Sequence, residues 1–149
     1  RRRHSFPTRR SSDLVDLEPL AQEKEIKLIG NCKDTTMVGS DILIYRMVYN
    51  LVENAIKYNH FGGQVTVTAY RKGKNICLSV EDTGSGIPAE LKERIFEPFF
   101  RVDKSRSRQL GGVGLGLALV REIVRVHDGR ITVQSSPSGG TIFEVVFTQ

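Results

Sequence analysis

The sequence predicts an α/β two-layer sandwich, in which a mixed, mostly antiparallel sheet of about five strands is covered by about three helices. Three observations predict this fold class. Short segments alternate apolar and polar residues as strands do, longer segments repeat apolar residues at helical spacing, and the two kinds are interleaved without internal repeats. A chain of 149 residues suits one domain whose core needs neither disulfide nor metal.

The first fourteen residues are set apart from the rest by their charge. Of the formal net charge of +5, residues 1–14 contribute +4 through five arginines and one aspartate, so residues 15–149 carry only +1. Residues 4–14 also resemble an in-frame translation of a widely used sequencing-adapter oligonucleotide. We interpret residues 1–14 as a non-native tail and residues 15–149 as the domain; a basic arm or a presequence are the alternatives. Without the tail, nothing indicates a nucleic-acid partner.

The N-terminal half predicts one long helix. Ser40 or Asp41 supplies an N-cap, and the helix is expected to reach about Asn59. Its core-facing stripe should consist of Ile44, Met47, Val48, Leu51, Val52 and Ala55. The end of an earlier helix, a short strand and a loop are expected before it at residues 18–24, 26–29 and 31–36.

The C-terminal half alternates strands with two further helices. A short helix should run from Pro88 to about Ile95, and a longer one over residues 115–126, ended by residues 127–129. Residues 99–112 have no periodicity, which is typical of a long loop that is either functional or disordered. Strands are expected at residues 65–70, 76–80, 131–134 and 141–147.

Several function classes find no support in the residue pattern. Cys32 and Cys77 lack metal-ligand spacing and are interpreted as ordinary reduced thiols, which weakly favours an intracellular location. His60 and His127 lack acidic neighbours suited to catalysis and are expected to be structural or exposed. No apolar run approaches the roughly 20 residues that span a membrane.

One face of the long helix carries polar residues, including two asparagines whose position within a helix calls for an explanation. Asn50, Asn54, Lys57 and Tyr58 cluster roughly 100° to one side of the apolar stripe. Asparagine is a poor helix former, and its amide oxygen suits Mg²⁺. The alternative for this face is simple solvation.

Asp82 comes between a strand and a glycine loop. Its carboxylate can accept a hydrogen bond from an exocyclic amine such as that of adenine. Gly84 and Gly86 allow positive φ and close approach of a ligand. A plain turn is the alternative.

Gly112, Gly114 and Gly116 lead directly into the helix at residues 115–126, whose free N–H groups favour phosphate. No strand precedes these glycines and no Gly-Lys-Ser/Thr follows, so neither a Rossmann fingerprint nor a P-loop is present. The phenylalanines beside the loop either pack in the core or anchor the loop, and the nearby basic residues are either solvated or neutralise phosphate. These residues are Phe96, Phe99, Phe100, Arg101, Lys104, Arg106 and Arg108.

Four segments in a fixed order carry a family resemblance. Residues 50–58, 82–86, 96–100 and 112–117 resemble the N, G1, F and G2 boxes of the catalytic ATP-binding domain of bacterial sensor histidine kinases. Residues 101–108 and the Gly-Gly-Thr-Ile-Phe ending at 139–143 are also similar. The resemblance covers residues 19–149 and implies a Bergerat-type, or GHKL-type, ATP-binding fold.

The resemblance implies an Mg²⁺–ATP site. Asn54 would ligate Mg²⁺ with help from Asn50, Lys57 would contact phosphate, Tyr58 would line the site, and Asp82 would bind the adenine amine. Asn50, Asn54 and Lys57 are therefore the expected catalytic residues. Further nucleotide-binding residues are expected at Gly84, Gly86, Ile87, Arg101, Lys104, Gly112, Gly114, Leu115 and Gly116.

The implied reaction is transfer of the ATP γ-phosphoryl group to a histidine in a two-component phosphorelay. Hydrolytic relatives place a glutamate base where this chain has Asn50, which favours kinase over ATPase chemistry. Glu53 is nearby but is expected to point about 100° away from Asn54. Ser85 departs from the branched apolar residue common at its position, with little effect expected.

The resemblance also implies partners. These are a histidine-bearing dimerisation domain, a response-regulator receiver domain and, in the full-length protein, a second copy. The location would be cytoplasmic, in a parent protein anchored to the membrane. No His-Glu-x-x-[Asn/Thr]-Pro segment occurs, so the chain is expected to bind ATP without phosphorylating itself. The alternatives are a non-catalytic nucleotide-sensing module and an anti-sigma-factor-type Ser/Thr kinase.

Overall fold

A five-stranded sheet forms one layer of the molecule and α-helices form the other. The computed structural model describes residues 2–5, 15–33, 35–102 and 114–149. The order of the sheet is β2 (Lys27–Cys32), β4 (Gln64–Lys72), β5 (Asn75–Asp82), β7 (Thr141–Thr148) and β6 (Arg130–Ser135). Only the β2–β4 pairing is parallel. Within the described ranges, one face is covered by α2 (Glu18–Glu23), α3 (Asp41–Lys57) and α5 (Gly116–Val126).

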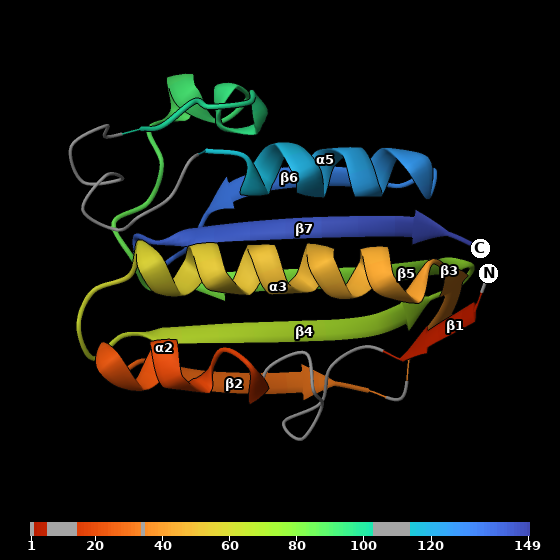
Figure 1. The fold of residues 1–149 in the computed structure, drawn as a ribbon, viewed down its shortest axis with the longest axis horizontal. Helices are drawn as coiled ribbons and strands as arrows, with labels where there is room; N and C mark the ends of the chain where they lie inside the picture. The colour runs from red at the N-terminus through yellow and green to blue at the C-terminus, as the bar shows by residue number, and fades with distance from the viewer. Residues whose placement is uncertain (1, 6–14, 34, 103–113) are drawn as a thin grey trace.

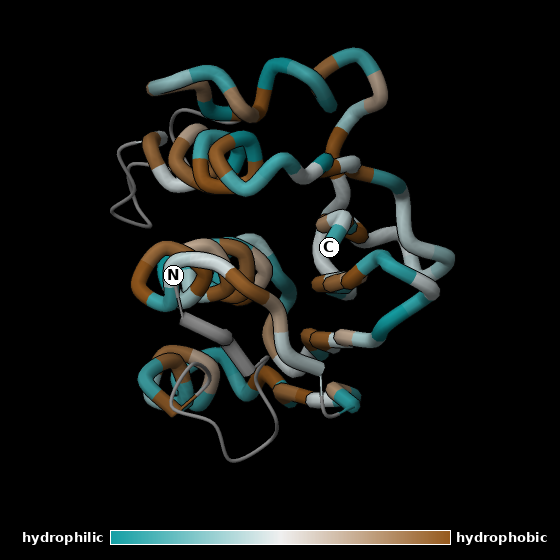
Figure 2. The backbone as a smooth tube through the Cα atoms, turned by 90° about the vertical axis from the view of Figure 1, so that its right-hand side faces the viewer, coloured by the Kyte–Doolittle hydropathy of each residue, from teal (hydrophilic) through white to brown (hydrophobic). Residues whose placement is uncertain are grey.

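The two layers are seen edge-on in Figure 2, with the helices on one side and the strands on the other. The predicted fold class is therefore confirmed. The predicted stripe of α3 faces the sheet, and Ile56 extends it: all seven residues are buried. Alternate residues of the central strands complete the core, which explains the period of two in the sequence. They are Val65, Val67, Ala69, Ile76, Leu78, Val80, Phe143, Val145 and Phe147.

The ends of α3 are tied down by neighbouring side chains. At its start, the Ser40 hydroxyl accepts a hydrogen bond from the Leu43 N–H at 3.3 Å, as predicted for an N-cap. At its end, the Lys24 ammonium donates to the carbonyl groups of Lys57 at 2.5 Å, Asn59 at 3.2 Å and Ile56 at 3.4 Å. A cation at this position satisfies carbonyls that the helix itself cannot and complements the helix dipole.

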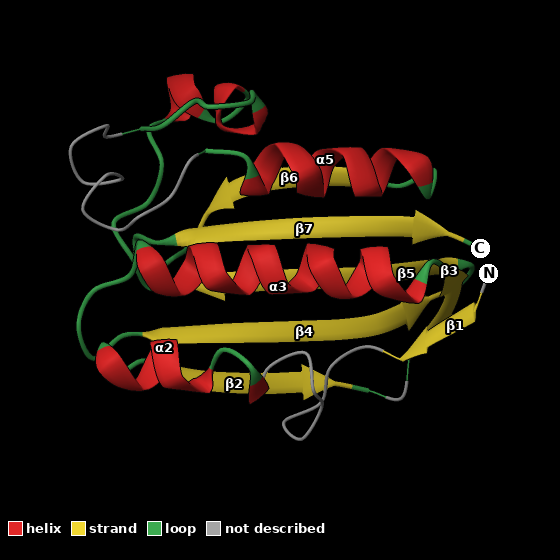
Figure 3. Cartoon of the chain, in the orientation of Figure 1, coloured by secondary structure: helices red, strands yellow, loops and turns green. Residues whose placement is uncertain are grey.

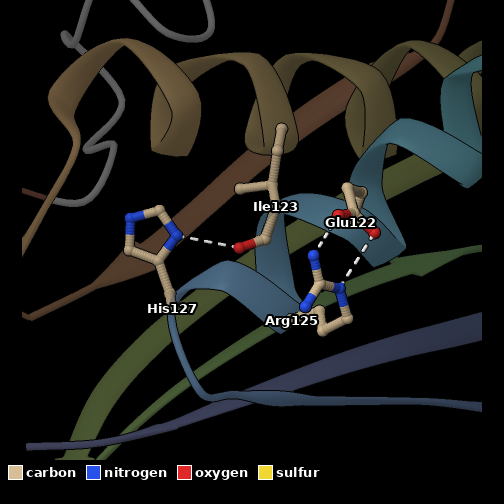
Figure 4. Close-up of polar contacts among 4 residues, drawn as sticks. All are labelled: Glu122, Ile123, Arg125 and His127. Atoms are coloured by element: carbon tan, nitrogen blue, oxygen red, sulfur yellow. Dashed lines mark hydrogen bonds and ion pairs between the residues drawn. The ribbon is translucent and has the colours of Figure 1, made fainter.

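His127 joins α3 to α5. Its Nε2 accepts a hydrogen bond from the Ser40 N–H at 3.0 Å, so its Nδ1 is the donor to the Ile123 carbonyl at 2.8 Å (Figure 4). A Cβ on Gly39 would lie 2.8 Å from the imidazole Cδ2, which requires glycine there. The predicted structural role of His127 fits this geometry. The neighbouring Arg125–Glu122 pair in Figure 4 is exposed and contributes little to stability.

The helix predicted from Pro88 to Ile95 is wrong. Two single 3₁₀ turns occupy this segment, Ala89–Leu91 and Arg94–Phe96. Neither has a side-chain cap, and Pro88 keeps an extended backbone with ψ of 139°. The adjacent apolar residues Ile95 and Phe96 are buried by one tight turn, so no longer helix is needed.

The loop predicted at residues 31–36 is also wrong at both ends. Strand β2 continues to Cys32, because parallel pairing with Thr68 and Ala69 extends the ladder. Strand β3 (Thr36–Gly39) then begins at Thr36 and pairs antiparallel with β1 (Arg2–Ser5) in a separate two-stranded sheet. This second sheet was not predicted, because residues 1–14 were excluded from the fold.

Candidate functional site

A cavity of about 560 Å³ opens where the C-terminal half of α3 meets the loop after β5 and the beginning of α5. Most of the residues predicted from the sequence to form a site line this one cavity. They come from four separate parts of the chain, and the fold brings them together. They are Asn50, Asn54, Lys57, Tyr58, Asp82, Gly86, Ile87, Arg101, Gly114, Leu115 and Gly116.

Three of the predicted nucleotide-binding residues are not among those just named. Two of them, Lys104 and Gly112, lie outside the described residues, as do Arg106 and Arg108. Gly84 is buried beside the wall: a Cβ there would lie 2.5 Å from the Tyr58 carbonyl oxygen. Gly84 therefore permits close packing of the Asp82 loop on the end of α3 and does not itself face the cavity.

Asp82 is the buried carboxylate of the site. Its Oδ1 accepts hydrogen bonds from the Gly84 N–H at 2.8 Å and the Thr141 N–H at 3.2 Å. Among the described residues, its Oδ2 has no donor. Burial raises the pKa of this carboxyl, and the two N–H donors oppose the rise in part. The aspartate is thus held by one oxygen, which leaves the other to accept from a ligand.

The polar face of α3 presents two amide oxygens that could ligate a metal ion. Asn50 and Asn54 both line the cavity, and within the described ranges neither side chain has a hydrogen-bond partner. A Cβ on Gly116 would lie 3.5 Å from Asn50 Oδ1, so the beginning of α5 approaches this amide closely. Amide oxygens without a protein partner are ligands that suit Mg²⁺. The residues present therefore fit a magnesium ion.

Glu53 was expected to point about 100° away from Asn54, and it is nevertheless among the residues that line the cavity. Its Oε1 lies 3.5 Å from the Lys57 ammonium nitrogen. The two residues are one helical turn apart, so both long side chains lean along the same side of α3. The pair holds the Lys57 ammonium at the cavity wall.

A hydrogen-bond network around Asn59 fixes the end of α3 to the Asp82 loop. Asn59 donates to the Gln64 carbonyl at 2.9 Å, and its Oδ1 accepts from the Thr83 hydroxyl at 3.1 Å. The Gln64 N–H donates to the same hydroxyl at 2.9 Å. Asn59 is 2% exposed, so its own two bonds are partly shielded from water, whereas the bond between Gln64 and Thr83 is exposed. A polar residue near a helix end was the one sequence signal for this network.

The opposite wall is formed by residues 96–100, the segment that resembles the F box, and by the beginning of α5. Phe96 is buried and packs edge-on against Phe143 at 6.2 Å between ring centres, while Phe99 is exposed. The Phe99 N–H donates to the Gly114 carbonyl at 2.8 Å, and Gly114 has a φ of +81° that favours glycine. Helix α5 begins without a side-chain cap at Leu115. Its first N–H groups therefore remain available to an anion.

Sequence reasoning missed part of the lining. Thr141 and Phe143 belong to the C-terminal segment whose similarity to kinases had been noted, so that similarity was the available signal. Glu53 was set aside because of its expected orientation relative to Asn54, and the others are apolar or small residues with no chemical signature. The missed residues are Glu53, Ser85, Ile95, Phe100, Val102, Leu117, Thr141 and Phe143.

The fold and the site together define a class of ATP-binding domain. The family model for histidine kinase-, DNA gyrase B- and HSP90-like ATPases (HATPase_c) matches residues 39–149, and the chain belongs to this family. Within it, the chain is similar to the ATP-binding domains of sensor histidine kinases, as its relatives show.

Two curated relatives illustrate the similarity. The sensor-like histidine kinase SenX3 of Mycobacterium tuberculosis is 47% identical over 107 residues, which cover 72% of this chain. The adaptive-response sensory kinase SasA of Crocosphaera subtropica is 42% identical over 142 residues, which cover 93% of it. The chain spans only 26% and 37% of the lengths of these two proteins.

Solved structures agree with this assignment. The catalytic domain of histidine kinase ThkA has a TM-score of 0.83 at 26% identity, covering 99% of this chain and 96% of that one. The mycobacterial sensor histidine kinase MprB has a TM-score of 0.80 at 26% identity with the same coverage. The predicted kinase family is thus confirmed.

Two further predictions concern the rest of the molecule. Neither Cys32 nor Cys77 takes part in a disulfide, as expected. Among the helices that the structure describes, none has the length and apolar character to cross a membrane.

Proposed function

We propose that this chain binds Mg²⁺–ATP and donates the γ-phosphoryl group to a histidine of a dimerisation domain in a two-component phosphorelay. One observation carries the proposal: a buried carboxylate, two amides and the uncapped beginning of a helix converge on one cavity. These groups match the three parts of the ligand, which are an amine-bearing base, a metal ion and a phosphate chain.

The adenine ring would occupy the part of the cavity beside Asp82. Its exocyclic amine would donate to Oδ2, the carboxylate oxygen without a described donor. Ile87 and Phe143 line the same cavity and offer apolar surface to the ring. This arrangement selects a base with an amine at the position facing the carboxylate.

The phosphates would extend toward α3 and α5. Asn54, assisted by Asn50, would hold Mg²⁺, which would supply positive charge to neutralise the phosphates. The Lys57 ammonium and the Arg101 guanidinium lie at the cavity wall as further cations. The first N–H groups of α5 would contact phosphate oxygens through the positive end of the helix dipole.

Phosphoryl transfer is favoured over hydrolysis by the amide at position 50. An amide cannot accept a proton from water as a carboxylate does. The nearby Glu53 carboxylate is engaged with Lys57. Catalysis would then consist of positioning the γ-phosphate and neutralising its charge for an acceptor brought by another domain.

The proposed partners follow from the relatives. One solved structure holds ThkA in complex with the response regulator protein TrrA, and the ThkA chain in it has a TM-score of 0.75 at 27% identity to this one. We extend this to a receiver domain as the second partner here, with a homodimeric full-length protein. A cytoplasmic position beneath a membrane anchor completes the proposal.

A transfer assay tests the proposed reaction. The chain is mixed with a separately produced histidine-bearing dimerisation domain of a sensor kinase and with ATP labelled at the γ-phosphate. We expect label on the dimerisation domain and none on the chain alone. The Asn54→Ala variant should lose transfer, while Asn31→Ala, at an exposed asparagine of β2, should keep it.

Three results would contradict the proposal. Label on the isolated chain would show an acceptor within it. ATP binding without transfer to any histidine would favour the non-catalytic module, and transfer to a serine or threonine would favour the anti-sigma-factor-type kinase.

A further inference from the structure

We infer that Ser136 and Glu81 are positioning residues that set the base selectivity of Asp82, although neither touches the cavity. The inference rests on the proposed adenine site. The structure assigns this role through the turn between β6 and β7, residues 136–140, which Ser136 fastens to the sheet and which leads directly into Thr141, one of the two donors to Asp82.

A continuous chain of hydrogen bonds holds the turn. The Ser136 hydroxyl donates to Glu81 Oε2 and therefore accepts from the Ser138 hydroxyl, at 2.9 Å, and from the Ser138 N–H, at 3.3 Å. The Ser138 hydroxyl in turn accepts from the Gly140 N–H at 3.5 Å. Every bond runs in the same direction, toward a carboxylate, which is the stronger kind of acceptor.

The Ser136–Glu81 contact is partly shielded from water. Ser136 is 5% exposed, unlike its neighbour Ser135, whose bond with Lys92 lies at the surface. Backbone bonds close the turn beneath it, from the Ser136 N–H to the Gly140 carbonyl and from the Gly139 N–H to the Ser136 carbonyl, both at 2.9 Å. A shielded bond to a charged group is costly to lose.

The turn packs against the Asp82 loop without free space. A Cβ on Gly140 would lie 2.0 Å from the Asp82 carbonyl oxygen, and a Cβ on Gly86 would lie 2.6 Å from the Gly139 carbonyl oxygen. Any shift of the turn therefore moves Asp82 or Gly86, and both line the cavity.

The position of the turn also determines where Asp82 Oδ2, the oxygen proposed to accept from the base, is directed. Thr141 follows the turn, and its N–H donates to Asp82 Oδ1 at 3.2 Å. This bond, with the one from Gly84, fixes the carboxylate plane and so the direction in which Oδ2 faces the base. Glu81 precedes Asp82 in β5, and its side chain lies on the opposite face of the sheet. The turn connects the two carboxylates, because Ser136 at its start bonds to Glu81 and Thr141 at its end bonds to Asp82.

Nucleotide titration tests the inference. The probes are Mg²⁺–ATP and the Mg²⁺ complex of purine riboside 5′-triphosphate, which lacks the exocyclic amine but keeps the phosphates. The measured ratio is the affinity for ATP divided by the affinity for the purine riboside triphosphate. We expect Ser136→Ala to lower this ratio about fivefold, because only the binding of ATP should weaken. Ser136→Thr, which keeps the hydroxyl, should retain the wild-type ratio. Glu144→Gln, at a half-buried glutamate of β7, is the matched control.

A double variant tests whether the change in the affinity ratio arises from the Ser136–Glu81 contact. If Ser136 acts through Glu81, the Glu81→Ala and Ser136→Ala changes together should lower the ratio no further than either alone. Ser138→Ala, at an exposed serine, provides a milder variant in case Ser136→Ala does not fold, and it should lower the same ratio by a smaller factor.

The outcomes separate the inference from the function on which it rests. Equal losses for both nucleotides, or an unchanged ratio in Ser136→Ala and Ser138→Ala, would overturn the positioning role while leaving ATP binding intact. A wild-type chain that fails to prefer ATP would overturn the proposed adenine contact itself, and the inference with it.

Discussion

At the scale of single residues, the site depends on how Asp82 is held. A buried carboxylate is costly unless donors compensate for lost hydration, and the N–H groups of Gly84 and Thr141 provide that compensation at one oxygen only. The remaining desolvation raises the pKa of Asp82. The same burial that makes the second oxygen selective for a donor therefore makes the carboxyl easier to protonate.

This predicts a pH dependence of ATP affinity. Because Oδ1 is occupied by two donors, the proton adds to Oδ2, which then cannot accept from the adenine amine. Affinity should rise with pH through the raised pKa of Asp82 and level off above it, so acidification toward that pKa should weaken binding. Calorimetric titrations at a series of pH values, from neutral into the acidic range, check the prediction.

The Asp82→Asn variant is the control for this titration. It has no proton to gain, so its residual affinity should lack the Asp82-dependent part of the slope. An identical slope in the wild type and the variant would assign the pH effect to another group, such as the phosphates.

At the scale of elements, α3 connects stability to function, because its buried stripe packs the core while its amide face lines the cavity. The sequence predicted this helix well, since Ser40 gives a start signal and the stripe has a clear period. Residues 88–95 were predicted poorly, because their apolar residues are too few to show a period. Lys24 could not be predicted, since its three acceptors lie more than 30 residues away.

The Lys24 contacts predict a specific loss of stability. Lys24→Met keeps the apolar stem but removes the donor, which leaves carbonyl groups at the end of α3 unsatisfied. We expect the free energy of unfolding to fall by about 1–3 kcal/mol in denaturant titrations. Lys27→Met, at an exposed lysine of β2, should change it by less than about 0.5 kcal/mol. Equal effects of the two substitutions would show that the Lys24 contacts contribute nothing.

At the scale of the whole molecule, the sandwich separates the site from the N-terminal strand. Figure 1 shows β1 and β3 at the end of the fold that holds the chain termini, whereas residues 89–102 lie at the opposite end. The sequence predicted the layers and eleven cavity residues, because the boxes occur in a fixed order. Thr141 and Phe143 lie in a C-terminal segment that resembles the kinases, but which of its residues face the cavity depends on how β7 pairs in the sheet, which the sequence alone does not determine.

This separation predicts that the tail is dispensable for binding. Deleting residues 1–14 removes β1 and its pairing with β3, but no residue of the described cavity. The Kd for Mg²⁺–ATP should stay within about twofold of the full chain, since remote changes leave a rigid site intact. A larger change would contradict the interpretation of these residues as foreign to the domain.

The central claim is that one cavity binds Mg²⁺–ATP through Asp82, and isothermal titration of the wild type and Asp82→Asn tests it most directly. In the variant, the amide oxygen can keep both backbone donors, so the NH₂ group would face the adenine amine, donor against donor. We predict saturable, Mg²⁺-dependent binding to the wild type and at least about tenfold weaker binding to the variant. Equal affinities, or no binding by the wild type, would contradict the account.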